Sequence, residues 1–526
     1  MATFVCKENG LMPAHSPSAM PARPRKFAGI LLTLLLLAAL LLPVIPAAAK
    51  EQDLSAFVRQ GMDLWRVPGM AVTVVNSEEV LYRESFGMTA IESGAPIDEN
   101  TLFAIASTTK AMVAAAILVL ADEGKLSLDD KVTDHIPELH FNSPLLTAQI
   151  TLRDLLAHRT GLPSTDFWSF FLDMPLDEQI RRLAEVPPSN PLRTGFIYQN
   201  TMFDLAGIVI ERVSGLRWDR FVAQRLWQPL GMRHTFGARS AIPGDLQHVL
   251  PYQIKDGELI QSEWDTPADM AAASGTVWST ILDMGRWAQF LLRGGVSANG
   301  DRLLSESAVE EMFKPQQLIP ASEFYPASSL SDPSWRTYGL AWFQQDFQGR
   351  KIDFHTGSLS GLIALIGLDR ASDRAVVILG NRDHAEMRHA VLWQVMDQHP
   401  HGPRRDWNQD VWNLYKSGRE AGRDRWADIE KSRLDNTRMS LLPKAYAGRY
   451  ENPAMGEVQV IVDGRRSVLN AGAIAMPMSH WHIDTFLVEY EPWEMKEFAT
   501  FNIGPDGEVT SMDLFEFRFE RLPPED

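Results

Sequence analysis

The chain has 526 residues, enough for about two to four domains and for a sizeable hydrophobic core. Hydrophobic residues make up 45% of it and charged residues 22%, an ordinary globular composition that excludes collagen-like and disordered chains. The formal net charge of −17 repels phosphate backbones and anionic lipids, so nucleic-acid binding is not expected.

The first predicted element is a signal peptide over residues 1–49. Basic residues at 23–26 precede an apolar run over 27–44, and the segment ends in alanines. This order is typical of a signal peptide removed after Ala49, and the alternative is an uncleaved membrane anchor. In both cases the body lies outside the cytoplasm, so we expect a secreted or periplasmic protein. The single cysteine, Cys6, precedes the body, which therefore has neither a disulfide framework nor a cysteine nucleophile.

Residues 50–395 have the pattern of one mixed domain. A helical pattern over 51–65 precedes the early strands, helical stretches fill 125–330, and late strands follow. The predicted strands lie at 70–75, 80–86, 352–356, 362–368 and 375–379. Because early strands, a helical insert and late strands share one segment, we expect a single α/β (α+β) domain whose sheet is completed by its last strands.

The pattern changes twice after this domain. A charged stretch over 396–437 is predicted to form an amphipathic linker helix. Short strands follow, with Asp463-Gly464 and Asp506-Gly507 as hairpin turns and phenylalanines alternating with charged residues over 515–520. These signals predict a separate antiparallel barrel or sandwich over 438–526.

The most informative segment is a helix that begins near Ser107 and runs to Leu120, with Gly124 in position to cap its end. Ser107 and Lys110 stand one turn apart, so the amine can reach the hydroxyl. About one such S-x-x-K spacing arises by chance in a chain of this composition. However, Lys110 is the only charge from 103 to 121, and burial lowers the pKa of a lysine toward that of a general base. The alternative is a capping serine beside a lysine that extends to the surface.

Two more short motifs follow in chain order, Tyr198-Gln199-Asn200 and His355-Thr356-Gly357. With Ser107-Thr-Thr-Lys110 they give the sequence a resemblance to the penicillin-recognising serine hydrolases: class C β-lactamases, D,D-peptidases, D-aminopeptidases and related esterases. Supporting stretches lie at 151–163, 229–232 and 274–280. The resemblance implies a β-lactamase/transpeptidase-like domain with an antiparallel sheet and a helical subdomain, followed by an antiparallel lipocalin-like β-barrel.

Two other triplets match these motifs in letters only. Tyr450-Glu451-Asn452 follows the third motif and lies in the predicted barrel, and Lys416-Ser417-Gly418 lies in the predicted linker helix. The third motif of the family must lie on a strand that aligns the substrate beside the serine. We therefore prefer His355-Thr356-Gly357, which leads into strand patterns.

The resemblance also implies roles for the residues. Ser107 would attack an acyl carbon while Lys110 or Tyr198 takes its proton, and the choice of base stays open. Asn200 would contact the amine and the substrate, or merely cap the helix that follows. The backbone N–H groups of Ser107 and Ser358 would form the oxyanion hole. Water would then hydrolyse the acyl-enzyme, without a metal or other cofactor.

The residue type at His355 helps to predict the class of substrate. β-Lactamases and carboxypeptidases of the family have a lysine there, a fixed positive charge toward the substrate carboxylate, whereas histidine is mostly neutral at pH 7. Family members with H-x-G look like D-aminopeptidases and esterases. With Gly357 and Ser358, His355 is therefore expected to bind an amide or ester substrate, and the alternative is a packed strand residue without substrate contact.

The predicted barrel carries His480 and His482, which strand alternation places on one face. A third ligand at suitable spacing is missing, so no metal site is expected. By the family resemblance, this barrel would border the active-site mouth and restrict the size of the acyl or leaving group.

The primary hypothesis is an exported serine hydrolase that forms a Ser107 acyl-enzyme from a small-molecule amide or ester. The second is a β-lactamase or D,D-carboxypeptidase, that is, a penicillin-binding protein. The rival from another class is a non-catalytic envelope protein that binds peptide or peptidoglycan. No nucleic acid is expected as a partner, membrane contact is expected only through an uncleaved N-terminal segment, and the oligomeric state stays open.

Overall fold

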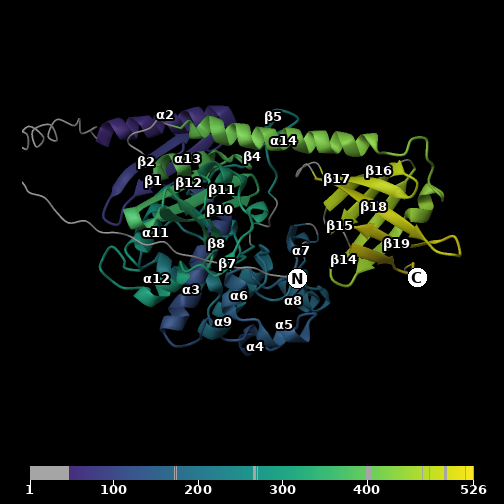
Figure 1. Ribbon diagram of the computed structural model, residues 1–526, viewed down its shortest axis with the longest axis horizontal. Coiled ribbons are helices and arrows are strands. Elements are labelled where there is room, and N and C mark those ends of the chain that lie inside the picture. Colours follow the sequence, from purple (N-terminus) through teal and green to yellow (C-terminus); the bar gives the residue numbers. More distant parts are fainter. Residues whose placement is uncertain are drawn as a thin grey trace, which may run out of the picture. The chain divides into compact units, whose positions relative to one another are not determined.

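The computed structural model describes residues 47–524 apart from short gaps (Figure 1). The gaps are 171, 173, 265–267, 269, 398–404, 465, 473, 491–494 and 516. Most of the predicted signal peptide, residues 1–46, lies outside the described residues. Cys6 is among these residues. Within the part of the chain that is described, no helix combines the length and the apolar character needed to cross a membrane.

The central feature of the first domain is an antiparallel sheet, which has eight strands within the described residues (Figure 1). In spatial order these are β2 (Val80–Gly87), β1 (Gly69–Val75), β12 (Arg374–Gly380), β11 (Leu362–Asp369), β10 (Arg350–Leu359), β9 (Phe343–Phe347), β8 (Arg336–Tyr338) and β7 (Gln317–Leu318). β1 pairs with β12 in a register that sets Met70 opposite Gly380. This pairing confirms that the late strands complete a sheet begun by the early ones.

Helices cover both faces of this sheet. The helices are α2 (Ala47–Trp65), α3 (Thr109–Asp122), α4 (Val132–His135), α5 (Pro144–Gln149), α6 (Leu152–Leu156), α7 (Asp166–Phe170), α8 (Leu176–Arg182), α9 (Asn200–Ser214), α10 (Trp218–Val222), α11 (Ile281–Leu292), α12 (Glu306–Met312), α13 (Met387–Met396) and α14 (Trp407–Lys431). Ala71 and Val377 share an apolar cluster with α3 and α11, whereas Val72 and Ile378 share another with α2 and α13. Because both faces are covered, β1 and β11 are buried along their whole length.

The predicted apolar helix is α3, in which every residue from Thr109 to Leu120 is buried. A 3₁₀ turn, Ala106–Thr108, leads into it, and Gly124 beyond its end has a φ of +68°, as expected for a helix cap. Just before the turn, the short strand β3 (Leu102–Ala104) pairs with β6 (Trp278–Thr280). These contacts fix both ends of the segment that carries Ser107. A further small hairpin joins β4 (Tyr252–Lys255) and β5 (Glu258–Gln261).

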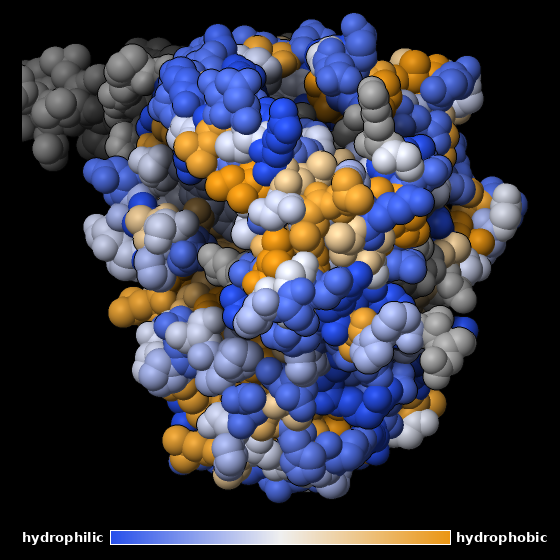
Figure 2. Space-filling view, turned by 90° about the vertical axis from the view of Figure 1, so that its right-hand side faces the viewer, coloured by the Kyte–Doolittle hydropathy of each residue, from blue (hydrophilic) through white to orange (hydrophobic). Residues whose placement is uncertain are grey.

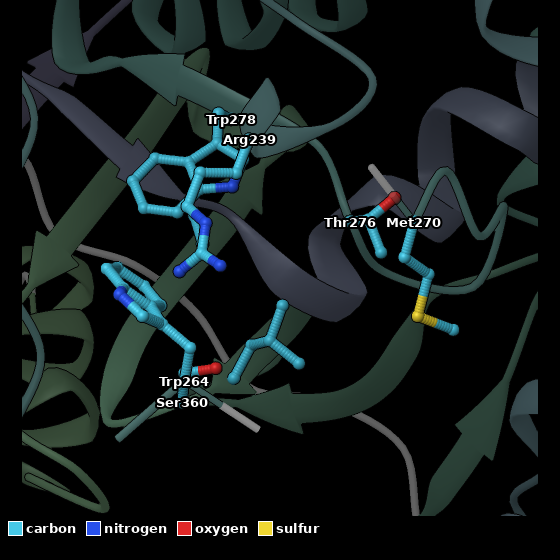
Figure 3. A pocket seen from close by; sticks show the side chains of 8 residues that line it. Arg239, Trp264, Met270, Thr276, Trp278 and Ser360 are labelled. Atoms are coloured by element: carbon cyan, nitrogen blue, oxygen red, sulfur yellow. The ribbon is translucent and has the colours of Figure 1, made fainter. Parts of the chain in front are cut away.

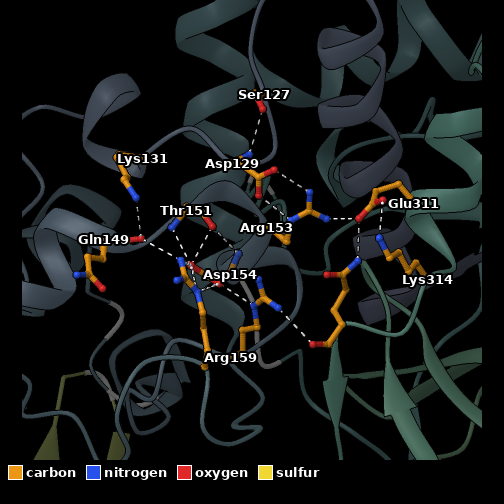
Figure 4. Close-up of polar contacts among 12 residues, drawn as sticks. Ser127, Asp129, Lys131, Gln149, Thr151, Arg153, Asp154, Arg159, Glu311 and Lys314 are labelled. Carbon is orange, nitrogen blue, oxygen red and sulfur yellow. Dashed lines mark hydrogen bonds and ion pairs between the residues drawn. The ribbon is translucent and has the colours of Figure 1, made fainter.

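A buried carboxylate fixes the turn that follows α6 (Figure 4). Asp154 accepts hydrogen bonds from the Thr151 N–H at 3.0 Å, from Arg159 Nε at 2.6 Å and from Arg193 Nη2 at 2.7 Å. A carboxylate without exposed surface needs such partners, because an unpaired buried charge is costly. The pairing holds the turn at His158, where the backbone has a φ of +52°.

The C-terminal part forms a closed antiparallel barrel, as the family resemblance implied. Its strands in the described residues are β13 (Gly448–Asn452), β14 (Gly456–Asp463), β15 (Arg466–Ala471), β16 (Ile474–His482), β17 (Thr485–Tyr490), β18 (Met495–Ile503), β19 (Val509–Leu514) and β20 (Phe517–Arg521). Pairing of β13 with β20 closes the barrel, and Tyr450, Val458 and Phe519 belong to its apolar core.

Helix α14 matches the predicted linker helix. Its first turns are anchored in the domain core by Trp407 and Val411, while most of its remaining residues are partly or fully exposed. After it, large apolar side chains stay exposed at Leu442 and Ile483. Figure 2 shows apolar residues gathered in a patch among hydrophilic ones on the face it views.

Candidate active site

The amine of Lys110 lies at the centre of the site. Its Nζ is 3.1 Å from Ser107 Oγ, 2.7 Å from Asn200 Oδ1 and 2.6 Å from the carbonyl oxygen of Ser274. The side chain is fully buried, so the alternative of a lysine that extends to the surface is wrong. Burial lowers the pKa of Lys110 from 10.5 to about 7.

Two carboxylates that the sequence analysis missed surround this amine. Asp204 accepts hydrogen bonds from the N–H of Ser274 at 2.9 Å and from its hydroxyl at 3.2 Å. Asp166 accepts one from Asn200 Nδ2 at 3.1 Å. Burial raises the pKa of Asp204 to about 6 and also raises the pKa of Asp166. Their charges act in the opposite sense to burial on Lys110, raising its pKa.

Tyr198 lies beside the amine, with its ring centroid 4.9 Å from Lys110 Nζ. Burial raises the pKa of Tyr198 well above 10, and the neighbouring Ser107 only partly opposes this. No described residue completes a hydrogen bond of ordinary geometry with its hydroxyl. The ring of His158 packs 4.3 Å away, and burial lowers the pKa of His158 well below 6.5. Both rings are therefore neutral near pH 7.

Asn200 does not cap the helix that follows it. Helix α9 begins at Asn200 itself, and the residue before it, Gln199, occupies the cap position without a side-chain cap bond. The amide oxygen of Asn200 instead accepts from Lys110, while its Nδ2 donates to Asp166. The amide is therefore oriented by two ionisable neighbours, Lys110 and Asp166.

Strand β10 passes directly against the backbone of the serine. A Cβ on Gly357 would collide with the Ile105 carbonyl oxygen and lie 2.9 Å from the Ser107 nitrogen, so glycine permits the approach. From behind, Arg388 Nη1 donates to the Gly357 carbonyl at 2.6 Å and to Ser358 Oγ at 3.0 Å. Gly357 and Ser358 thus adjoin Ser107, with the Ser358 hydroxyl turned to Arg388.

His355 is buried within the same strand. Its Nε2 accepts from the Tyr338 hydroxyl at 3.0 Å, and its Nδ1 donates to the Thr356 carbonyl at 2.6 Å. Burial, and then the charge of Lys110, lower the pKa of His355 to about 3. With both ring nitrogens paired and no exposed surface, the geometry favours the packed strand residue over a direct substrate contact.

A pocket opens beside the end of β10 (Figure 3). It is lined by Ala104, Arg239, Trp264, Met270, Thr276, Trp278, Leu359 and Ser360. The Arg239 guanidinium lies 3.9 Å from the Trp264 ring centroid. Gly275, next to a lining residue, is close enough that a Cβ there would lie 3.6 Å from the Ser107 nitrogen. The pocket therefore presents an aromatic and thioether surface near the serine.

The rejected triplets lie apart from this cluster. Lys416 is half-exposed on α14, and Tyr450 is buried in the barrel, where its hydroxyl donates to the Tyr446 carbonyl at 2.8 Å. His480 Nε2 contacts the Ile483 carbonyl at 2.9 Å. Over the described ranges, no three His, Cys, Asp or Glu side chains are grouped so that they could hold a metal ion.

Comparison with protein families gives two matches along the chain. The beta-lactamase family model matches residues 54–400. A model described as a domain of unknown function, DUF3471, matches residues 433–525. The first match confirms the resemblance predicted from the three motifs, and the second fits an appended C-terminal domain.

Individual proteins with similar sequences or folds agree with this. Unguisins hydrolase ungD of Aspergillus violaceofuscus (strain CBS 115571) is 25% identical over 460 residues, covering 80% of this chain and 78% of that protein. Protein flp of Staphylococcus aureus (strain MW2) is 23% identical over 340 residues, 63% of each chain. The octameric penicillin-binding protein homologue from Pyrococcus abyssi has a TM-score of 0.58 at 21% identity, over 89% of this chain and 99% of that one. The structural likeness supports the fold.

Proposed function

Because the chain belongs to the beta-lactamase family, whose members are generally serine hydrolases, we propose that it hydrolyses a small amide or ester through an acyl-enzyme on Ser107. The observation that carries this proposal is the 3.1 Å contact between Lys110 Nζ and Ser107 Oγ at a fully buried amine. A buried amine with a pKa of about 7 can take the serine proton near neutral pH.

The partners of Lys110 support its role as the base. A neutral amine has two N–H bonds and one lone pair. Asn200 Oδ1 and the Ser274 carbonyl can only accept, so they use the two N–H bonds. The lone pair is then left for the Ser107 hydroxyl. Tyr198, whose pKa is raised by burial, keeps its proton in the free enzyme and is proposed to donate it to the leaving group.

The developing oxyanion needs backbone donors beside the nucleophile. Gly357 packs closely on the backbone of Ser107. The next residue along β10, Ser358, therefore also lies near the serine. We assign the oxyanion hole to the N–H groups of Ser107 and Ser358. Water then attacks the ester carbonyl of the acyl-enzyme and gives one proton to the Tyr198 phenolate left by acylation. The bond between the acyl carbon and the Ser107 oxygen breaks, the acid product leaves, and the Ser107 oxygen takes its proton back from Lys110.

The substrate class follows from charge and from the pocket. His355 has a pKa of about 3, so this strand position offers no fixed positive charge to a substrate carboxylate. The neighbouring pocket, lined by Trp264, Met270 and Trp278, offers aromatic and thioether side chains to a small apolar group. The missing positive charge at His355 supports a D-aminopeptidase-like or esterase-like substrate over a β-lactam.

A fluorophosphonate probe tests the proposal. The full chain is expected to react with one equivalent, and intact-mass and peptide analysis should find the adduct on Ser107. Ser107→Ala, folded as judged by circular dichroism, should not react. Labelling that persists in Ser107→Ala would contradict the proposal.

The second candidate is a β-lactamase or D,D-carboxypeptidase, which is favoured by the fold shared with penicillin-binding protein homologues. Nitrocefin turnover or a stable penicillin adduct would support it over an aminopeptidase or esterase. The non-catalytic receptor would be supported if Lys110→Ala kept ligand binding and the wild type had no activity on aminoacyl p-nitroanilides or p-nitrophenyl esters.

Export is also part of the proposal. The order of basic, apolar and small residues over 1–49 supports a cleaved leader and a secreted or periplasmic body. N-terminal sequencing of the protein recovered after expression of the full chain in a bacterium tests this. A mature chain that begins at Lys50 is expected, and an intact leader in the cytoplasm would contradict it.

A further inference from the structure

Helix α7 contacts the catalytic cluster at one residue and the barrel at another. At its first residue, Asp166 Oδ1 accepts from Asn200 Nδ2 at 3.1 Å. Two residues later, Trp168 Nε1 donates to the carbonyl oxygen of Ala454 at 2.8 Å. Trp168 has no exposed surface, and Ala454, between β13 and β14, is packed into the apolar core of the hydrolase domain.

Other contacts hold the barrel in the same region. The Phe167 and Phe515 rings lie 5.2 Å apart, and Arg182 Nη1 donates to the Pro453 carbonyl at 2.7 Å. The turn between β13 and β14 therefore contacts α7 and α8 through apolar and polar groups, and Phe515, which follows β19, adds an aromatic contact to α7. Such a mixed, buried interface defines the position of α7 more closely than its own five residues can.

On the other side, α7 is tied to the start of α9. Thr165 Oγ1 lies 2.8 Å from Thr201 Oγ1, next to the bond between Asp166 and Asn200. With Nδ2 drawn to the carboxylate, Asn200 must present its oxygen to Lys110. In the flipped orientation an amide N–H would face the amine, and the carboxylate would face an oxygen.

We infer that the barrel is part of the active-site assembly: it holds α7, so that Asp166 acts as a positioning residue that orients Asn200 on Lys110. This inference rests on the function proposed above and goes beyond it. It gives the C-terminal domain a task in activating the nucleophile, distinct from any restriction of substrate size.

Several titratable groups face Lys110 and share control of its charge. They are Asp166 from α7, Asp204 from α9, His158 after α6, Tyr198 before α9 and His355 from β10. Of these, the Asp166 carboxylate is the one carried by α7, the helix that contacts the barrel. A substitution that weakens the contact between the barrel and α7 should therefore change the environment of Lys110 through Asp166.

The test is the second-order rate of fluorophosphonate labelling of the full chain, followed across pH. Trp168→Phe keeps the ring and removes the N–H that reaches Ala454, and labelling is expected to slow by about tenfold. Trp426→Phe is the matched control, because that indole also packs on the barrel, against Phe498, but donates to the exposed Glu430. It should label within about twofold of the wild type.

A double-mutant cycle separates positioning from general destabilisation. Asp166→Ala should slow labelling at least as much as Trp168→Phe, and adding Trp168→Phe to Asp166→Ala should change nothing more. Asp166→Asn keeps an acceptor for Asn200 but loses the charge, so it should recover most of the rate while moving the pH midpoint lower.

Wild-type labelling rates in Trp168→Phe, or multiplicative effects in the double variant, would overturn the inference. A lower melting temperature with an unchanged rate and pH midpoint would also overturn it, because it would mean that the contact is only structural. If the wild type itself fails to label, the proposed function has failed instead.

Discussion

The guanidinium of Arg388 donates to the carbonyl oxygen of Gly357 at 2.6 Å, so a buried cation holds the strand that adjoins Ser107. The same side chain is held by the Glu386 carboxylate, with Nη2 at 2.9 Å and Nε at 3.1 Å. The position of β10, and with it the proposed oxyanion hole, thus depends on a buried ion pair.

Arg388→Lys keeps the charge but cannot reproduce the several directed bonds of the guanidinium. We expect the labelling rate to fall about tenfold while the melting temperature changes little. Arg388→Met would leave the buried Glu386 carboxylate without the guanidinium and with only His389 beside it, at a cost of about 3–5 kcal/mol in the free energy of unfolding. An unchanged labelling rate in Arg388→Lys would show that Arg388 does not position β10 for the reaction.

Two glycines give opposite predictions on substitution by alanine. Gly357→Ala places a methyl group against the backbone of Ile105 and Ser107, so labelling should fall by about a hundredfold or more. Gly418, in the rejected triplet on α14, has nothing within 4 Å of an added Cβ. Gly418→Ala should therefore raise the free energy of unfolding by about 1 kcal/mol and leave labelling unchanged. Urea unfolding and labelling kinetics measure both effects.

The pH dependence of labelling should follow Lys110. Its neutral form is required as the base, and its pKa is about 7, so the rate should rise with pH around that value. In Asp204→Asn the nearby negative charge is gone, so the pKa of Lys110 falls and the midpoint moves to lower pH. A midpoint that stays in place, or moves upward, would contradict the assigned electrostatics.

The free energy of unfolding should also depend on pH because of the lowered pKa of Lys110. The pKa of Lys110 is about 7 when folded and near 10.5 otherwise, so between these values the unfolded chain binds more protons. The free energy of unfolding should therefore increase through this group as pH rises from about 7 to 10.5, and that gain should be lost again as pH falls from 10.5 to about 7. Lys110→Met lacks this contribution, so the melting temperature of the wild type should rise relative to the variant across that range. Parallel curves would exclude a depressed pKa.

The pocket beside β10 predicts a separation of binding from chemistry. Trp264→Ala removes an aromatic wall on which Arg239 is stacked, at some distance along the chain from the catalytic cluster. KM for substrates with a small apolar group should rise about tenfold, with kcat and fluorophosphonate labelling nearly unchanged. Equal changes in KM for substrates with and without that group would place the substrate elsewhere.

Much of the fold was predictable because its signals are local. The buried helix α3 and the hairpin of β1 and β2 follow from apolar runs and turn residues close together in sequence. The three-residue strands β3 and β6 were missed, since so short a segment has no readable period.

The candidate site divides in the same way. Ser107 and Lys110 are one helical turn apart, so their meeting follows from spacing alone. Asp204 also had a signal, because it stands four residues after Asn200 on one helix. Asp166 and Arg388 had none, since their contacts depend on how distant segments pack. For His355 the motif identifies the residue type, but the partners of its two ring nitrogens depend on packing and could not be predicted.

The register that joins Met70 to Gly380 has a consequence for biogenesis. Strand β1 emerges early from the ribosome, but its inner partner β12 is synthesised roughly three hundred residues later, so the sheet cannot close until the domain is nearly complete. For most of its synthesis the polypeptide would expose unpaired strand edges. Delayed closure of this kind is compatible with the export proposed above, because a chain that has not yet folded can still pass through a translocation channel.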